Sequence, residues 1–226
     1  MYTLHYAPDN ASLIIRLVLD GAGIPYRTAL VNRATRAQDG ANYRALNPAG
    51  LIPTLETPLG PIFETGAILL WLADRHGLGP APASPDRPAF LKWLFYLSNT
   101  AHADLRQLFY PHLYCPFEAH PGHAEIIARR MQHSFALLDA AAGAHSALFA
   151  PAQPLAAYTL ALARWSVLYP KDGPRWFDLS RYPTLQTLAL AQERRVETPV
   201  IARVEGLGPQ PFSAPVHAVP PEGSVS

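Results

Sequence analysis

Cysteine, charge and long apolar runs are all scarce in this chain of 226 residues. The single cysteine, Cys115, excludes an intramolecular disulfide and a cysteine-rich zinc site. Charged residues make up 15% of the chain, and 18 Lys and Arg against 17 Asp and Glu leave a net charge of +1. Nucleic-acid binding needs a clustered basic surface, so this composition argues against it. No stretch approaches the roughly 18 continuous apolar residues of a membrane span.

The N-terminus lacks the pattern of a secretory signal. It has no basic region followed by an apolar run and a small-residue cleavage site. A chain with one cysteine is also compatible with a reducing compartment. We therefore expect a soluble, cytoplasmic protein, and its 49% of apolar residues is enough for a sizeable core.

Proline is over-represented and segregated. The chain has 24 prolines, where average usage of about 5% would give roughly 11. Four of them fall within residues 78–88, which predicts a semi-rigid linker between a domain at 1–77 and a domain at 89–207. Five more fall within residues 208–226, which predicts an extended, mobile tail unless that tail packs against the body.

The two predicted domains differ in the spacing of their apolar residues. Alternating and helical patterns follow each other before the linker, in the order β-α-β-α-β-β-α. The strands are expected at 2–6, 26–31, 52–55 and 61–63, and the helices at 12–20, 42–46 and 64–76, with Ser12 capping the first helix and Gly77 ending the third. Beyond the linker, helices are expected at 88–110, 124–142, 155–169, 184–194 and 200–204. The segment His120–His123 contains Pro and Gly, so we expect a loop there and no metal site.

Two adjacent motifs point to a family. NPAGLIPTL (residues 47–55) and FETGAILLWL (residues 63–72) match, in spacing as well as residue type, a pattern typical of the cytosolic glutathione transferases. The chain resembles that family over residues 1 to about 207, and most closely its bacterial beta-like members. The resemblance implies an α/β, thioredoxin-like N-terminal domain that binds glutathione and an all-α C-terminal domain that binds a small apolar electrophile. It also implies a homodimer, and a reaction that needs no cofactor besides glutathione as co-substrate.

The same resemblance assigns the glutathione site. The Ile52–Pro53 bond would be cis, so that the backbone of Ile52 pairs with the cysteinyl backbone of glutathione like an added strand. Glu64 and Thr65 start a helix whose free N–H groups attract an anion. The N–H and hydroxyl of Thr65 would bind the γ-glutamyl carboxylate, and Glu64 would pair with the α-ammonium group or orient the loop.

Activation of the glutathione thiol requires a hydrogen-bond donor to the sulfur, because the thiolate is the nucleophile. Beta-like members carry a cysteine in the pattern Y-x-P-x-x-C-S, and here YAPDNAS puts Ala11 in its place. A mixed disulfide through that position is excluded. The remaining donors are Asn10 and Ser12, ranked equally, with Tyr6 behind them. Their structural alternatives are a turn residue, a helix cap and a core aromatic ring.

Further positions follow from the resemblance. His102 falls where beta-like members have a histidine that faces the thiol, and Arg33 or Arg36 lies in the segment expected to meet the glycyl carboxylate. The second-substrate pocket is expected to include Phe109, Tyr114 and Trp165, although rings at helical spacing are more often core residues.

Three functions remain open from sequence. The first is a glutathione transferase acting on an apolar electrophile. The second is a glutathione-dependent disulfide reductase or peroxidase that uses no protein cysteine. The third is a non-catalytic, glutathione transferase-like binding module that recruits a partner protein.

Overall fold

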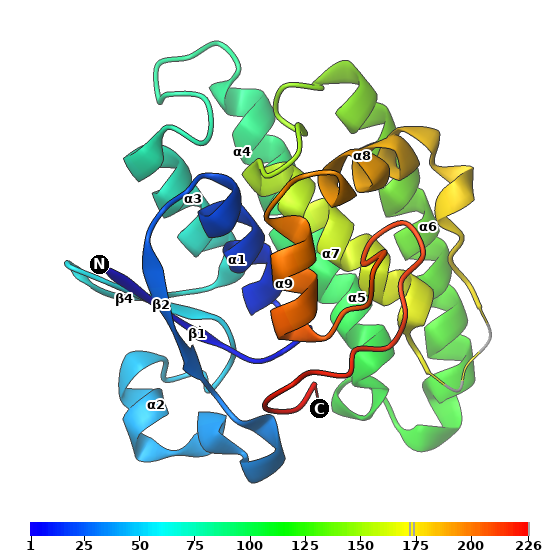
Figure 1. Cartoon of the computed structure of the whole chain (residues 1–226). Coiled ribbons are helices and arrows are strands. Elements are labelled where there is room, and N and C mark those ends of the chain that lie inside the picture. Colours follow the sequence, from blue (N-terminus) through cyan, green and yellow to red (C-terminus); the bar gives the residue numbers. More distant parts are fainter. Residues whose placement is uncertain (172, 174, 226) are drawn as a thin grey trace.

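The computed structural model describes residues 1–171, 173 and 175–225 (Figure 1). Its N-terminal part has the predicted order of strands and helices. These are β1 (Tyr2–Tyr6), α1 (Ser12–Gly21), β2 (Tyr26–Leu30), α2 (Ala41–Leu46), β3 (Thr54–Thr57), β4 (Gly60–Phe63) and α3 (Thr65–His76). Two short 3-10 helices that the sequence did not reveal, η1 (Arg33–Thr35) and η2 (Ala37–Asp39), precede α2.

The four strands form one sheet in the order β2-β1-β3-β4. β1 and β2 are parallel, which a crossover through α1 allows, and the other two pairings are antiparallel. Leu4 and Leu55 are partners at the centre and are fully buried. α1 and α3 cover one face of the sheet and α2 lies on the other, where Tyr43 packs edge-on against His5 (Figure 1).

The rest of the described chain contains helices joined by loops and short 3-10 turns. The helices are α4 (Arg87–Tyr96), α5 (His102–Phe109), α6 (His120–Ala144), α7 (Pro154–Leu168), α8 (Pro183–Glu193) and α9 (Thr198–Glu205). The expected single helix over 88–110 is interrupted by a π-helical segment, η3 (Leu97–Ala101). The predicted loop at His120–His123 is wrong, because Pro121 sits in the first turn of α6, where its missing N–H is not needed.

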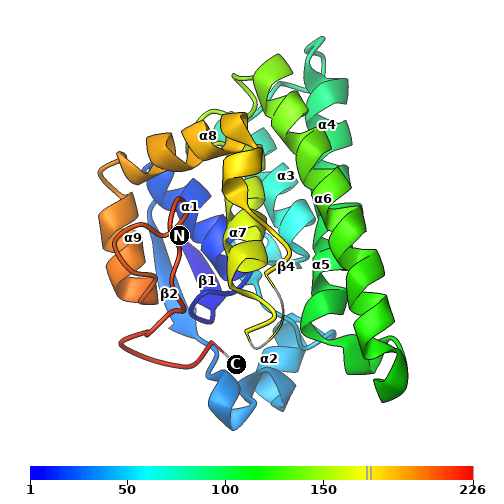
Figure 2. The same ribbon diagram turned by 90° about the vertical axis from the view of Figure 1, so that its right-hand side faces the viewer.

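α7 is the central helix of this half. Every residue in it except Val167 is buried, as expected for a helix that is apolar all round and packed on all sides. It contacts α1 of the N-terminal half as well as α4, α5 and α8 (Figure 2). None of the helices in the described residues is both long and apolar enough to cross a membrane.

The C-terminal tail has no helix or strand over the described residues 208–225, but it packs against the body; Ser226 lies outside the described residues. Phe212 is fully buried, and Glu193 of α8 accepts hydrogen bonds from the N–H groups of Phe212 and Ser213. The tail then returns to α9, where Val219 N–H donates to Gly206 C=O at 2.9 Å. Any side chain at position 206 would collide with the Val219 carbonyl, so this close approach requires glycine.

A buried ion pair joins the two halves of the chain. Arg164 of α7 and Asp9 of the β1–α1 loop are both fully shielded from solvent, and their side chains pair through two bonds of 2.9 Å. The other guanidinium N–H groups of Arg164 donate to the carbonyls of Leu207, Pro211 and Val216. All five N–H donors of the guanidinium therefore have acceptors, which is what makes a buried charge tolerable.

We expect Arg164→Met to cost about 3–5 kcal/mol in the free energy of unfolding, because it leaves the Asp9 carboxylate buried without its cation. Urea denaturation measures this loss. Arg36→Met is the matched control: its pair with Asp39 is largely exposed, so its loss should cost no more than about 1 kcal/mol. Equal losses in the two variants would show that the buried pair has no special role.

Candidate functional site

The start of α3 offers backbone donors for an anion. Thr65 is its first residue and Glu64 is its N-cap, whose side chain is exposed and makes no capping hydrogen bond. Glu64 has a φ of 71°, in the left-handed region that non-glycine residues avoid. Backbone strain of this kind clusters at ligand sites, and here it accompanies an uncapped helix N-terminus with its positive dipole end.

The loop before β3 presents unpaired backbone groups. The Ile52–Pro53 bond is cis, as expected. The Leu51 carbonyl accepts hydrogen bonds from Asn47 Nδ2 at 2.7 Å and from the Tyr43 hydroxyl at 2.6 Å, which fixes the loop. Within the described residues the Ile52 N–H and C=O make no hydrogen bond, so both are available to an extended ligand.

A chain of contacts runs from α3 into the second half. Thr65 is buried, and its side chain lies close enough to the Tyr158 hydroxyl of α7 to lower the pKa of that hydroxyl, against the larger effect of burial. The Tyr158 hydroxyl lies 2.9 Å from His102 Nδ1 on α5. The His102 ring lies 5.8 Å from that of Trp165, whose indole N–H donates to Asp9 at 2.8 Å. These contacts connect the uncapped start of α3 to the loop that holds Asn10.

The surroundings of His102 and Tyr158, in the middle of this series of contacts, keep both side chains uncharged. Desolvation and, to a smaller extent, the charge of Arg106 lower the pKa of His102 to about 4. Burial also raises the pKa of the Tyr158 hydroxyl, to which the nearby Glu64 carboxylate contributes. At neutral pH His102 is therefore uncharged, so it offers one donor and one acceptor rather than a positive charge.

The three candidate thiol donors sit in different environments. Asn10 is partly exposed, and its Oδ1 accepts from the Ala11 N–H at 2.7 Å, which leaves its NH₂ group without a partner among the described residues. Ser12 is fully buried, and its hydroxyl donates to the Ala7 carbonyl at 3.0 Å. The prediction that Ser12 caps the first helix is wrong: Ala11 is the N-cap, and Ser12 is the first helical residue.

Tyr6 is buried and its hydroxyl donates to the Glu222 carboxylate in the tail. The Arg16 guanidinium lies over its ring at 4.6 Å from the centroid. Burial and the Glu222 carboxylate raise the pKa of Tyr6, so the hydroxyl stays protonated. While the tail holds this position, the Tyr6 proton is committed to Glu222 and not to a ligand.

The residues expected around a second substrate are spread out. Phe109 packs edge-on against Tyr169, with ring centroids 5.3 Å apart. Tyr114 is 44% exposed and its hydroxyl accepts from Arg106. Trp165 is buried and belongs to the contact chain just described. No ring contact among the described residues joins Phe109, Tyr114 and Trp165 to one another.

Sequence reasoning missed the residues that assemble this site. Asp9, Tyr158, Arg164 and Glu205 were not singled out, and all four are buried. Glu205 pairs with Arg16 at 2.7 Å and accepts from the Asp9 N–H; burial raises its pKa to about 7. A usable signal was present for Arg164, since a lone arginine inside an apolar helix is tolerated only when its charge is paired.

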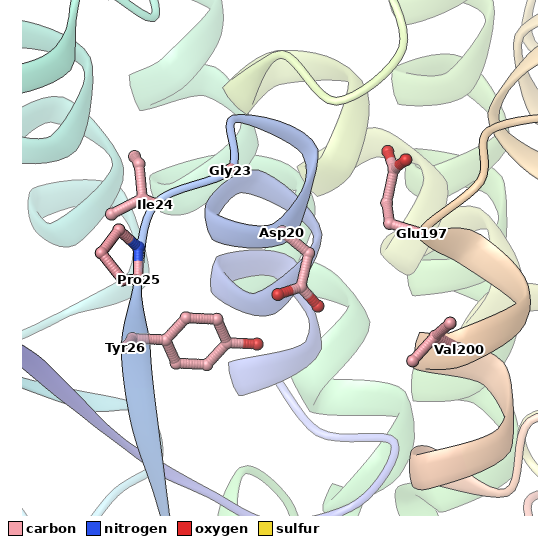
Figure 3. Close-up of a pocket in the computed structure, with 7 residues that line it drawn as sticks. All are labelled: Asp20, Gly23, Ile24, Pro25, Tyr26, Glu197 and Val200. Atoms are coloured by element: carbon pink, nitrogen blue, oxygen red, sulfur yellow. The ribbon is translucent and has the colours of Figure 1, made fainter.

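A surface cavity lies elsewhere, between the α1–β2 connection and α9 (Figure 3). Its volume is about 450 Å³, and its lining includes the carboxylates of Asp20 and Glu197. Both have partners: Asp20 bonds to Tyr26, and Glu197 to Arg195. No cluster of three or more metal-ligating side chains occurs among the described residues.

Comparison with known proteins agrees with this architecture. Residues 11–75 match the glutathione S-transferase N-terminal domain family. This segment is therefore similar to a glutathione S-transferase N-terminal domain, and the chain has the glutathione S-transferase fold.

Three similar proteins illustrate the match. The disulfide-bond oxidoreductase YfcG of Escherichia coli K12 is 33% identical over 104 residues, which are 42% of this chain and 48% of that protein. A Sulfitobacter glutathione transferase homolog, solved with bound glutathione, has a TM-score of 0.74 at 21% identity and covers 89% of this chain and 96% of its own. The beta-class enzyme of Sphingomonas chungbukensis has a TM-score of 0.71 at 22% identity, covering 90% and 98%. The chain spans about half the length of the first curated relatives it matches.

Protonation of His102 should make stability depend on pH. An unfolded histidine has a pKa near 6.5, so between about pH 6.5 and 4 the unfolded chain binds a proton that the folded chain does not. The contribution of His102 to stability is therefore complete above pH 6.5 and is lost as the pH falls. We expect wild type to lose about 1–2 kcal/mol relative to His102→Gln between pH 7 and pH 5.

Urea denaturation of both proteins at the two pH values measures this difference, and the titration of Glu205 cancels because both proteins contain it. His133→Gln, at an exposed position on α6, is the matched control and should follow wild type. Parallel pH profiles for wild type and His102→Gln would contradict the assignment of a neutral His102.

Proposed function

We propose that this protein is a glutathione transferase that joins the thiolate of glutathione to a small apolar electrophile. The observation that carries the proposal is the contact chain Thr65–Tyr158–His102–Trp165–Asp9, which links an uncapped helix N-terminus to the loop of Asn10. The similar Sulfitobacter protein is solved with bound glutathione. That supports the same ligand here.

Glutathione would bind along the edge of the sheet domain. The Ile52 N–H and C=O pair with the cysteinyl backbone, as an added strand would. The γ-glutamyl carboxylate lies against the N–H and hydroxyl of Thr65, where the helix dipole favours an anion. Glu64, exposed beside it, pairs with the α-ammonium group.

Asn10 activates the thiol of glutathione. Of the three side chains considered, only Asn10 has a donor group without a partner among the described residues. Its NH₂ group, with the backbone N–H at the start of α1, stabilises the thiolate and lowers the pKa of the thiol. The proton goes to solvent. The sulfur then bonds to the electrophilic carbon, and the leaving group departs with its electron pair.

The electrophile approaches from the side of α5 and its C-terminal loop, where Phe109 and Tyr114 lie. The resemblance also favours a two-fold homodimer. Exposed apolar side chains on the surface, such as Phe95 on α4 and Leu51 beside the candidate site, are consistent with burial in a second copy.

A second candidate, glutathione-dependent disulfide reduction, is favoured by the match to the oxidoreductase YfcG. In that reaction the thiolate of one glutathione attacks a disulfide sulfur, and a second glutathione resolves the mixed disulfide. The two thiols are oxidised to glutathione disulfide and the substrate is reduced to two thiols. No protein cysteine is required.

We expect Thr65→Ala to weaken binding of reduced glutathione by about 1–3 kcal/mol, because the γ-glutamyl carboxylate loses a buried hydroxyl partner. Isothermal titration calorimetry measures the change. Thr187→Ala is the matched control, since this exposed threonine of α8 only bonds to the Pro183 carbonyl of its own helix. Wild type that gives neither heat nor a thermal shift with millimolar glutathione would remove both enzymatic candidates and favour a binding module.

We expect Asn10→Ala to lower kcat/KM about tenfold to hundredfold and to shift the midpoint of the pH–rate profile upward. One hydrogen bond to an anion is worth roughly 1.5–3 kcal/mol, and it acts on the ionised sulfur. Glutathione affinity should barely change. The assay uses 1-chloro-2,4-dinitrobenzene and, separately, a small disulfide.

The comparison variants for Asn10→Ala are Ser12→Ala, Tyr6→Phe and the exposed amide control Gln186→Ala, all of which should retain catalysis. If Asn10→Ala also retains the wild-type rate, the backbone N–H groups and not the Asn10 side chain activate the thiol. Tight glutathione binding without turnover of either substrate would place the binding-module function first.

A further inference from the structure

The C-terminal tail consists of a fixed part and an exposed end. Residues 207–219 are anchored by Arg164, by the buried Phe212 and by the Val219–Gly206 hydrogen bond. Beyond them, Pro221, Glu222 and Gly223 are exposed. We call the described residues 220–225 the tip. The tip can therefore move while the anchored part stays in place.

The tip lies across the β1–α1 loop and the end of β2 (Figure 2). The Glu222 carboxylate accepts from the Tyr6 hydroxyl, and the Val225 carbonyl accepts from Arg33 Nη1. Gly223, between them, has a φ of 74°. A Cβ atom at that position would lie 2.8 Å from Leu30 Cδ1 and 3.3 Å from Pro8 Cδ.

These contacts coincide with groups that a ligand would need. Tyr6 is the last residue of β1, and Pro8 lies with Asn10 in the loop that follows it. Arg33 is a candidate partner for the glycyl carboxylate, and its other amino group donates to the Tyr110 hydroxyl at 3.1 Å, just beyond the end of α5. The tip thus spans from the thiol loop to the entrance expected for the second substrate.

We propose that the surface formed by Tyr6, Pro8, Leu30, Arg33 and Tyr110 is a binding site for an extended acidic peptide segment, occupied by the tip of the same chain. The tip leaves this surface when substrates bind. The inference rests on the proposed function, since glutathione is itself a short acidic peptide that competes for Arg33 and for the space beside Pro8.

The contacts that hold the tip are of a kind that a ligand can displace. The tip consists of exposed and half-buried residues, and its contacts include those of Glu222 with Tyr6 and of Val225 with Arg33, whereas Phe212 and Arg164, which fix residues 207–219, are fully buried. When only the open fraction of molecules admits a ligand, the apparent Kd rises in inverse proportion to that fraction. A weakly held tip should therefore reduce glutathione affinity by roughly threefold to tenfold.

Gly223→Val is the variant that should release the tip from its docked position. A β-branched residue disfavours the positive φ at this position, and its Cβ meets Leu30. Glu222→Gln weakens the contact with Tyr6 and should have a smaller effect. Glu125→Gln, which removes an exposed carboxylate on α6, is the control for charge.

The docked tip can be observed directly by NMR in the full-length protein. In wild type without ligand, a nuclear Overhauser contact should join the Gly223 Hα protons to the Leu30 methyl groups. Saturating glutathione should abolish it and move the tip resonances toward random-coil values. By calorimetry, Gly223→Val should bind glutathione about threefold to tenfold more tightly than wild type, and Glu125→Gln should match wild type.

Two results would overturn this inference and leave the proposed function standing. They are a Gly223–Leu30 contact that persists at saturating glutathione, and binding by Gly223→Val that is no tighter than binding by wild type. Weaker binding by Gly223→Val would show instead that the tip completes the site. Absence of binding in both wild type and Gly223→Val would overturn the proposed function together with the inference.

Discussion

The Asp9–Arg164 ion pair is the constraint on which the rest of the site depends. Arg164 comes from the middle of the buried central helix and Asp9 from a loop 155 residues earlier. Because the guanidinium also binds three tail carbonyls, one side chain fixes the loop, α7 and the tail relative to one another. A lysine has three donors on a flexible stem and would leave several of these acceptors unpaired.

This pair explains how residues from both halves share one site. Asp9 also accepts from the Trp165 indole, and its own N–H donates to Glu205 of α9. With φ at 47°, Asp9 holds a backbone conformation that these bonds stabilise against its intrinsic cost. Asn10 is the next residue, so the backbone that presents it depends on groups in the helical half, and the Ala11 N–H then orients its side chain.

Local signals in the sequence were sufficient for the order of the elements and for the glutathione S-transferase fold. Gly77 ends α3 in the left-handed conformation, and a proline in the first turn marks the start of α8. The π-helical segment Leu97–Ala101 was not predictable, because it depends on an approach to α3: a Cβ on Gly66 would lie 3.1 Å from Ser98. The path of the tail depends in the same way on Arg164, which no local pattern connects to residues 207–216.

The helix starts divide into two kinds, and the division bears on function. α4, α6, α7, α8 and α9 each carry a proline in the first turn, which removes an N–H that would otherwise lack a partner. α1, α2 and α3 have neither such a proline nor a side-chain cap, and α5 continues directly from the π-helical segment. A missing cap costs about 1 kcal/mol, so leaving a helix start open is unfavourable for folding alone. Two of these open starts, those of α1 and α3, border the candidate site, where one would hold the thiolate and the other the carboxylate of the same ligand.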